Sequence, residues 1–296
     1  MQKRYFERTD RRSADAGWWI GAMLSIVAAM IFVAGASAGQ QPAAPAAQQP
    51  AAQQPAAAAA PSATDTEPLP SATEILQRNV EARGGEAALR KHRHITWKGT
   101  FEMPGMGIKG DVLLHASAPN LFHLTIEAPG VGTITQGFDG TVGWADNPMT
   151  GPTVNSGKEL EMTKIQSDFY ADLNTAEYFS KIETVGRETY AGEPSYKVAF
   201  TTKGGMELFT YYSVATGLMV GTTGNFPTPM GEVFVETETS DFKEFDGALY
   251  PTTSVQKAMG AEQVLKLTEP DFGEIDPAIY ALPEAVKTLV AGQPAQ

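Results

Sequence analysis

The chain has 296 residues, a net charge of −12 and no cysteine. The acidic balance argues against nucleic acid and anionic membrane surfaces as partners, because both attract basic patches. The absence of cysteine excludes a lipid-modified N-terminal Cys, structural disulfides and thiolate chemistry at a metal or catalytic site.

Residues 1–38 have the features of an export signal. Residues 16–36 carry no charge, and Ala36-Ser37-Ala38 has the small-x-small form that signal peptidase accepts. We expect cleavage after Ala38. The alternative is an N-terminal inner-membrane anchor, because an uncharged run of this length approaches a membrane span. In either case the rest of the chain is expected to be exported, to the periplasm.

The next segment, residues 39–70, consists almost entirely of Pro, Ala and Gln. Such a composition has little apolar surface to bury, so we expect a disordered, extended linker. The folded domain is expected over residues 71–290, followed by a flexible tail at residues 291–296.

A helix opens this domain. Ser71 and Glu74 have the spacing of a capping box, in which each side chain accepts from a backbone N–H of the first turn. The apolar side of this helix is formed by Ile75, Leu76 and Val80. Gly84 and Gly85 end the helix, and residues 86–90 can form one further helical turn.

Strands follow, in which apolar and polar residues alternate. If the turn near residues 117–120 pairs residues whose numbers sum to 238, one face of the hairpin is apolar and the other polar. The apolar face then holds Val112, Leu114, Leu124 and Ile126. The polar face holds Asp111, His115, His123, Thr125 and Glu127.

The next hairpin is centred on Asp139-Gly140. Ile134, Gln136 and Phe138 fall on one side of an extended chain, and Asp139-Gly140 fits the positive-φ positions of a two-residue turn. Val142 and Trp144 are expected to open the returning strand.

The pattern then changes to helical. Met162, Ile165, Phe169 and Leu173 recur at three- or four-residue intervals, which predicts a helix with one apolar face. Residues 174–181 are expected to add a second short helix. Pro and Gly residues between 148 and 157 make the approach to this helical insertion irregular.

From about residue 183 the pattern is again that of strands, with turn signals about every ten residues. No alternation of strands with long helices is present. We therefore predict an α+β domain: an unclosed antiparallel β-barrel of about 10–11 strands, with an N-terminal helix and a helical lid inserted mid-chain.

The sequence offers little for catalysis. It contains no nucleophile elbow, HExxH motif or Walker loop, and no cofactor is expected. His115 and His123, with Asp111 and Glu127, could hold zinc across a hairpin. The simpler interpretation is a solvated polar face. We therefore expect no enzymatic activity, and a hydrolase using carboxylates or histidines is the less favoured alternative.

The arrangement resembles the LolA/LolB/LppX-like superfamily of exported lipoprotein and lipid carriers, which includes outer-membrane lipoprotein-sorting proteins. The matching features span residues 71–282: the helix that runs into Gly84-Gly85-Glu86-Ala87-Ala88-Leu89, Phe138-Asp139-Gly140 before Gly143-Trp144, the insertion at 159–173, Tyr211-Tyr212 before Gly217-Leu218, Phe245-Asp246-Gly247 before Tyr250-Pro251, and residues 272–283. The resemblance implies an unclosed barrel covered by helices, an apolar cavity for acyl chains and no cofactor. The absence of Cys departs from the lipid-anchored mode of LolB and LppX.

The function expected from these features is that of a non-enzymatic, monomeric carrier or receptor for a lipid or a lipoprotein acyl chain, which could also meet membrane-associated export components. The alternative is a tethered interaction or sensing module whose core is solid. The inward-facing candidates for the cavity are Ile95, Trp97, Phe101, Val112, Leu114, Leu124, Ile126, Ile134, Phe138 and Trp144 from the strands, with Met162, Ile165 and Phe169 from the lid.

Overall fold

The computed structural model describes residues 68–228 and 231–292. The predicted export signal, nearly all of the linker and most of the tail lie outside the described residues. No helix within the described ranges combines the length and the apolar character that a membrane crossing requires.

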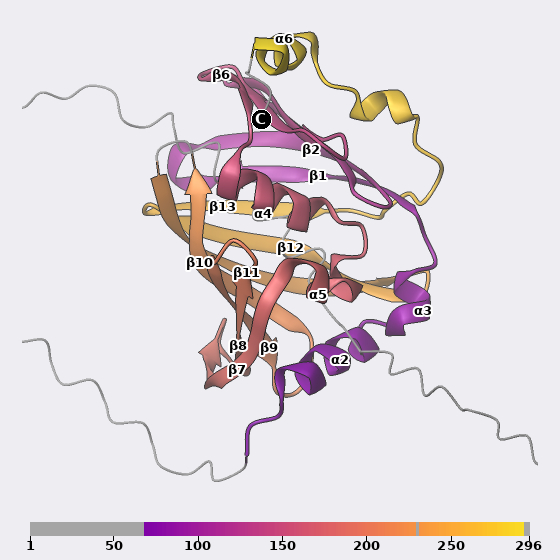
Figure 1. The fold of residues 1–296 in the computed structure, drawn as a ribbon, viewed down its shortest axis with the longest axis vertical. Coiled ribbons are helices and arrows are strands. Elements are labelled where there is room, and N and C mark those ends of the chain that lie inside the picture. Colours follow the sequence, from indigo (N-terminus) through magenta and orange to yellow (C-terminus); the bar gives the residue numbers. More distant parts are fainter. Residues whose placement is uncertain (1–67, 229–230, 293–296) are drawn as a thin grey trace, which may run out of the picture.

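The described residues form one antiparallel sheet of 13 strands, in the order β6-β5-β4-β3-β2-β1-β13-β12-β11-β10-β9-β8-β7 (Figure 1). The strands are β1 (His94–Met103), β2 (Ile108–Ser117), β3 (Leu121–Ala128), β4 (Gly132–Phe138), β5 (Gly143–Asn147), β6 (Gly151–Val154), β7 (Phe179–Tyr190), β8 (Glu193–Thr202), β9 (Glu207–Ser213), β10 (Met219–Thr228), β11 (Gly231–Phe245), β12 (Ala248–Ala258) and β13 (Ala261–Leu267). Because β6 and β7 are its two ends, the sheet is not closed, as predicted.

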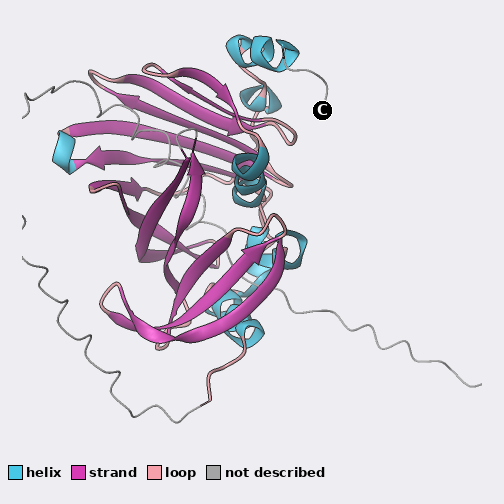
Figure 2. Cartoon of the chain, turned by 60° about the vertical axis from the view of Figure 1, so that its left-hand side comes forward, coloured by secondary structure: helices cyan, strands magenta, loops and turns pink. Residues whose placement is uncertain are grey.

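The helices are short. They are α2 (Ala72–Ala82), α3 (Gly85–Leu89), η2 (Pro104–Met106), α4 (Gly157–Ser167), η3 (Ala171–Leu173), α5 (Thr175–Tyr178), η4 (Pro277–Tyr280) and α6 (Glu284–Gly292). Figure 2 shows the sheet bending between its two halves, with these helices, apart from η2, gathered toward one side.

The predicted capping box of α2 is confirmed. The Ser71 hydroxyl accepts from the Glu74 N–H at 3.3 Å, and the Glu74 carboxylate accepts from the Ser71 N–H at 2.7 Å. Gly84, at φ 111°, ends the helix, and a Cβ at this position would lie 2.2 Å from the Gly247 carbonyl oxygen. Glycine is therefore required there by both the backbone angle and the close approach of another chain segment.

The predicted register of the β2–β3 hairpin is also confirmed. Val112 lies opposite Ile126, and His115 lies opposite His123, so each pair sums to 238. Alternation of side chains along a strand then separates the apolar face from the polar one.

The hairpin between β4 and β5 differs from the prediction. Phe138 pairs with Gly143, so the loop has four residues and not two. The Asp139 carboxylate accepts from the N–H groups of Thr141 and Val142, at 2.8 and 2.7 Å. A two-residue type I′ turn needs positive φ at both central residues, and of Asp139 and Gly140 only Gly140 has it. Asp139 instead organises a wider loop through its side chain.

The sheet has more strands than the predicted ten or eleven, and one of the additional strands is β6, which lies in a stretch that was expected to be irregular. Pro152 lies within β6, and a proline cannot donate to a sheet ladder. Since β6 is an edge strand with only β5 beside it, that missing donor is tolerated.

The predicted helical insertion is present but is divided. Helix α4 ends at Ser167, and the Asp168 carboxylate accepts from the Tyr170 N–H at 2.8 Å. This local hydrogen bond competes with continuation of the helix. The chain then forms η3 and α5, and β7 begins at Phe179, a few residues before the predicted position. Residues 157–178, from α4 to α5, are called the insertion below.

Candidate functional site

The interior lies between the sheet and the insertion and contains two apolar clusters. The first is centred on β1 to β4 and receives Phe169 and Ala171 from the insertion. The second joins α2 and strands β8 to β10 to Met162, Ile165 and Leu173 of the insertion. Helix α4 contacts β4 and β5 on one side and β10 on the other. The insertion therefore covers the space between the two halves of the sheet.

Twelve of the thirteen predicted cavity residues lie in these clusters. Those in the first cluster are Ile95, Trp97, Phe101, Val112, Leu114, Leu124, Ile126, Ile134, Phe138 and Phe169. Those in the second are Met162 and Ile165.

Trp144 lies on the other face of the sheet. It pairs with Gly137, whose neighbour Phe138 points into the interior, and its ring centroid lies 5.7 Å from that of His123. Residues directly opposite in an antiparallel pair share a face, so Trp144 faces outward with Gly137 and His123. The prediction that Trp144 lines the interior together with Phe138 was therefore wrong; it would require β5 to be shifted by one residue against β4.

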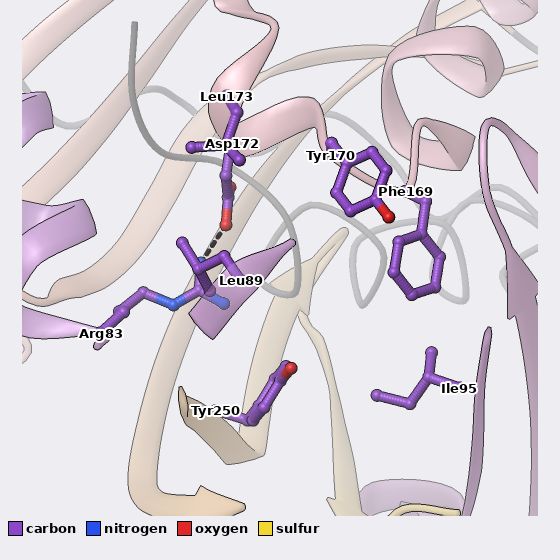
Figure 3. Close-up of a pocket in the computed structure, with 8 residues that line it drawn as sticks. All are labelled: Arg83, Leu89, Ile95, Phe169, Tyr170, Asp172, Leu173 and Tyr250. Carbon is purple, nitrogen blue, oxygen red and sulfur yellow. Dashed lines mark hydrogen bonds and ion pairs between the residues drawn. The ribbon is translucent and has the colours of Figure 1, made fainter. Parts of the chain in front are cut away.

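A buried ion pair ties the insertion to the end of α2 (Figure 3). The Arg83 guanidinium donates to the Asp172 carboxylate, and the two side chains are only 6% and 4% exposed. Arg83 is also fixed by β12, because its Nε donates to the Leu249 carbonyl oxygen at 3.1 Å and its guanidinium lies 5.8 Å from the centroid of the Tyr250 ring. Arg83 therefore joins three elements: the end of α2, β12 and the insertion at η3.

Burial raises the pKa of Asp172 to about 6. The Arg83 charge and hydrogen bond oppose this shift, while the nearby Asp168 charge adds to it. The second carboxylate oxygen of Asp172, Oδ1, is buried without a hydrogen-bond partner among the described residues. A buried charge is costly unless it is fully paired, so the Arg83–Asp172 contact adds little net stability to the packing of the insertion.

Further polar contacts tie the insertion to the rest of the molecule; among them the Tyr170 hydroxyl donates to the His92 carbonyl oxygen and the Lys203 N–H donates to the Tyr178 carbonyl oxygen, both at 2.9 Å. At the start of α4, the Glu161 carboxylate accepts from the Gly204 N–H at 2.7 Å, and Lys158 pairs with Glu232 at 2.6 Å. Past the end of α4, the Phe169 N–H donates to the Pro119 carbonyl oxygen at 2.7 Å. These polar contacts are few compared with the continuous ladders of the sheet.

The cavity beside the Arg83–Asp172 pair, under the insertion, is small. The cavity lined by Arg83, Leu89, Ile95, Phe169, Tyr170, Asp172, Leu173 and Tyr250 has a volume of about 20 Å³ (Figure 3). About 10–15 Å³ is enough for one water molecule, so this cavity cannot hold an acyl chain as it stands. A larger hollow of about 210 Å³ lies beside the start of α2 and borders the second apolar cluster through Ile75 and Tyr212. It is lined by Pro70, Glu74, Ile75, Arg78, Tyr196, Tyr212, Ser213 and Gly217.

A row of polar side chains crosses the floor of the interior. Its members lie directly opposite one another on five neighbouring strands, and each is at most 3% exposed. The row consists of Thr210, Thr222, Thr237, Gln256 and Gln263. It shares a face with Leu208, Val235 and Leu265 of the two apolar clusters.

Several atoms of this polar row lack partners among the described residues. They are the hydroxyls of Thr210, Thr222 and Thr237 and the side-chain amide of Gln263; the neighbouring Ser254 hydroxyl also has none. An unpaired buried hydroxyl or amide costs about 1–3 kcal/mol. A bound molecule with ester, amide or hydroxyl groups could satisfy them, and so could water.

Sequence reasoning missed Arg83, Asp172 and the polar row. Asp172 was marked only by its position inside an apolar stripe, between Phe169 and Leu173. In the sequence, the row consists of threonines and glutamines at strand positions that have an apolar residue at i−2 or i+2. Neither signal identifies a partner, because the partner strands are distant in sequence.

The histidine pair does not lie in the interior. Burial lowers the pKa values of His115 and His123, and for His123 the neighbouring His115 lowers it further. The Thr96 hydroxyl lies 3.0 Å from Nδ1 of His115. Among residues 68–228 and 231–292, no group of three His, Cys, Asp or Glu side chains is arranged to hold a metal ion.

The architecture, an unclosed antiparallel sheet covered by helices, is the one that the resemblance to the LolA/LolB/LppX-like superfamily implied. No family model matches the chain, and a search of curated proteins finds no match.

Solved structures similar to this chain include a LolA superfamily protein from Nitrosomonas europaea, at 13% identity and a TM-score of 0.48 over 72% of this chain and 99% of that one. A DUF1329 family protein from Desulfovibrio piger shares 12% identity at a TM-score of 0.49, over 71% and 97% of the two chains. An outer membrane lipoprotein-sorting protein domain from Vibrio parahaemolyticus shares 12% identity at a TM-score of 0.44, over 70% and 94%. At these identities no residue role is transferred.

Proposed function

We propose that this protein is a non-enzymatic carrier or receptor, acting in the periplasm, that holds the acyl chain of a lipid or lipoprotein between the sheet and the insertion. The observation that carries the proposal is the arrangement of the interior. Two apolar clusters on the floor of a sheet that does not close on itself are covered by a short helical insertion.

Binding beneath the insertion requires the insertion to move, because the cavity that lies there has room for about one water molecule. Opening exposes the buried side chains of Met162, Ile165 and Phe169, each worth roughly 1.5–3 kcal/mol when fully buried. An acyl chain that takes their place recovers about 0.8 kcal/mol for each buried CH₂. A chain of ordinary length can therefore offset the cost of opening.

The polar row narrows the class of ligand. An amphipathic molecule with an uncharged polar group, such as an ester or amide, would place hydrocarbon on the apolar clusters and hydrogen-bond to Thr222 and Thr237. A fully ionised group would be disfavoured in the row itself, since no cation lies there, so the carboxylate of a fatty acid would have to stay outside the row while its hydrocarbon chain is bound.

The proposal is tested by binding of a fluorescent fatty acid, together with native mass spectrometry of protein purified from membrane-containing cells. We expect co-purifying lipid and saturable fluorescence. Phe169→Ala should speed uptake and release, because Phe169 is part of the cover. Tyr211→Ala is the matched control, since Tyr211 is equally buried but packs with Tyr190 and Val220 in a separate cluster.

The second candidate is a tethered interaction or sensing module with a solid core. The small volume of the interior cavity favours it. In that case the protein would be lipid-free after purification, would not bind the fluorescent fatty acid, and Phe169→Ala would only lower the free energy of unfolding.

A further inference from the structure

One end of the sheet carries apolar side chains at the tips of its turns. In an antiparallel meander every second turn lies at the same end. The turns after β1, β3, β5, β8 and β12 therefore share one end, which we call the turn rim, and β11 begins at this end. Figure 1 shows the β1–β2 and β12–β13 turns next to each other at the left of the sheet, and the register of β1 with β13 agrees.

Three methionines stand at the tips of this rim. Met106 lies between β1 and β2, Met149 between β5 and β6, and Met259 between β12 and β13, and they are 50%, 57% and 62% exposed. Phe234, close to the start of β11 at the same rim, is 58% exposed. These four are a majority of the large apolar side chains that are exposed in the described residues.

The opposite end of the sheet provides an internal comparison. Its turns, at residues 118–120, 139–142, 191–192, 214–218 and 246–247, contain none of the exposed large apolar side chains of the described ranges. Asp139 and Asp246 occupy two of them. The apolar tips are therefore a property of one end and not of turns in general.

We propose that the turn rim docks on the surface of a lipid bilayer of neutral or zwitterionic headgroups. Separate tips that project singly from different turns do not form the contiguous patch that a protein partner requires. A bilayer is a continuous, fluid apolar medium, so several unbranched side chains can enter it without a matching shape. Methionine is suited to this because its side chain is flexible and adapts to its surroundings.

The charges near the rim select the kind of bilayer. Lys109 pairs with Glu102 at 3.0 Å, Lys257 with Glu238 at 2.8 Å, and Lys158 with Glu232 at 2.6 Å. Each of these lysines is thus matched by a carboxylate. Lys203, in the turn after β8, adds one positive charge, which is outweighed by the negative charges of Glu127, Glu207 and Glu262 near the turns. Such a rim has no net attraction for anionic headgroups.

This inference does not depend on the proposed carrier function, because it concerns the outer rim and not the interior. It is tested on the full chain by methionine oxidation, followed residue by residue by mass spectrometry. Sulfoxide formation reports exposure of each thioether to hydrogen peroxide. The two conditions compared are protein alone and protein bound to phosphatidylcholine vesicles, with binding verified by cosedimentation.

We expect oxidation of Met106, Met149 and Met259 to slow severalfold on the vesicles. Buried Met103 and Met206 should react slowly in both conditions. Unchanged rates at the rim in vesicle-bound protein would overturn the proposal, since the chain would then be held by another segment. Protection that grows with protein concentration without vesicles would also overturn it, in favour of a second copy of this chain.

A second measurement uses brominated phosphatidylcholine, which quenches tryptophan that enters the bilayer. Met259→Trp should be quenched beyond the wild-type level. Thr141→Trp, at an exposed position of the opposite end, is the matched control and should add no quenching. Equal quenching of the two variants would contradict docking by the turn rim. Fatty-acid binding, measured in parallel, separates this result from the fate of the carrier proposal.

Discussion

At the scale of single residues, Asp172 links the insertion to Arg83 through a buried ion pair. Its pKa is raised by burial from 3.8 to about 6, so between about pH 4 and pH 6 the folded protein retains a proton that the unfolded chain has released. The free energy of unfolding should therefore fall as pH rises through this window and level off above it. The maximum change is about 3 kcal/mol.

The measurement is urea unfolding of the wild type and Asp172→Asn at several pH values from 4 to 7. The variant does not titrate at this position, so its stability relative to the wild type should increase from pH 4 to pH 6. Parallel pH profiles for the two proteins would show that Asp172 does not titrate in this range.

Two threonines of β11 provide a second prediction at this scale. Thr237 has a buried hydroxyl without a partner among the described residues, whereas the Thr239 hydroxyl donates to the Met219 carbonyl oxygen at 2.9 Å. Without ligand, Thr237→Val should raise the free energy of unfolding by about 1 kcal/mol and Thr239→Val should lower it by a similar amount. If chemical denaturation shows the same loss in both variants, a water molecule holds the Thr237 hydroxyl and the polar row is not waiting for a ligand.

The elements themselves show what local sequence can predict. Alternating polarity was enough for the β2–β3 register, and the spacing of Ser71 and Glu74 was enough for the start of α2. Both depend on residues close together in the chain. The β4–β5 loop was mispredicted because Asp-Gly fits two kinds of turn, and the choice depends on side-chain hydrogen bonds that the pattern does not show.

The candidate site was less accessible to this reasoning. The alternation of apolar and polar residues along the strands indicated which apolar residues face inward. It could not show whether the interior is packed or contains a cavity, because the alternation is the same in both cases. The Arg83–Asp172 pair joins residues 89 positions apart, and the polar row depends on the pairing of five strands. Such contacts are set by the tertiary fold.

The insertion is the element whose mobility separates the two functions. Its polar contacts with the rest of the molecule are few, whereas β3 has ladders on both sides. Amides of residues 159–167 should therefore exchange with deuterium faster than those of residues 121–126, and added fatty acid should slow them. Exchange at equal rates, unaffected by fatty acid, would identify the insertion as ordinary core.

At the scale of the whole molecule, we propose that the interior binds an acyl chain and that the turn rim docks on a bilayer. The interior is closed by the insertion, and the rim lies where the turns after β1, β5 and β12 end. A protein that takes lipid from a membrane needs both, since the ligand must leave the bilayer and enter a dry space. The central claim is that the insertion opens to admit it.

This claim is tested most directly by locking the insertion. Since the chain has no cysteine, Lys158→Cys with Glu232→Cys can be bridged by a short bis-maleimide at a pair that joins α4 to β11. Lys257→Cys with Glu238→Cys is the control, because this bridge joins two strands of the sheet. We predict that fatty-acid uptake is lost only in the protein locked between α4 and β11. Uptake at the same rate in locked and unlocked protein, or no uptake in either, would contradict the account.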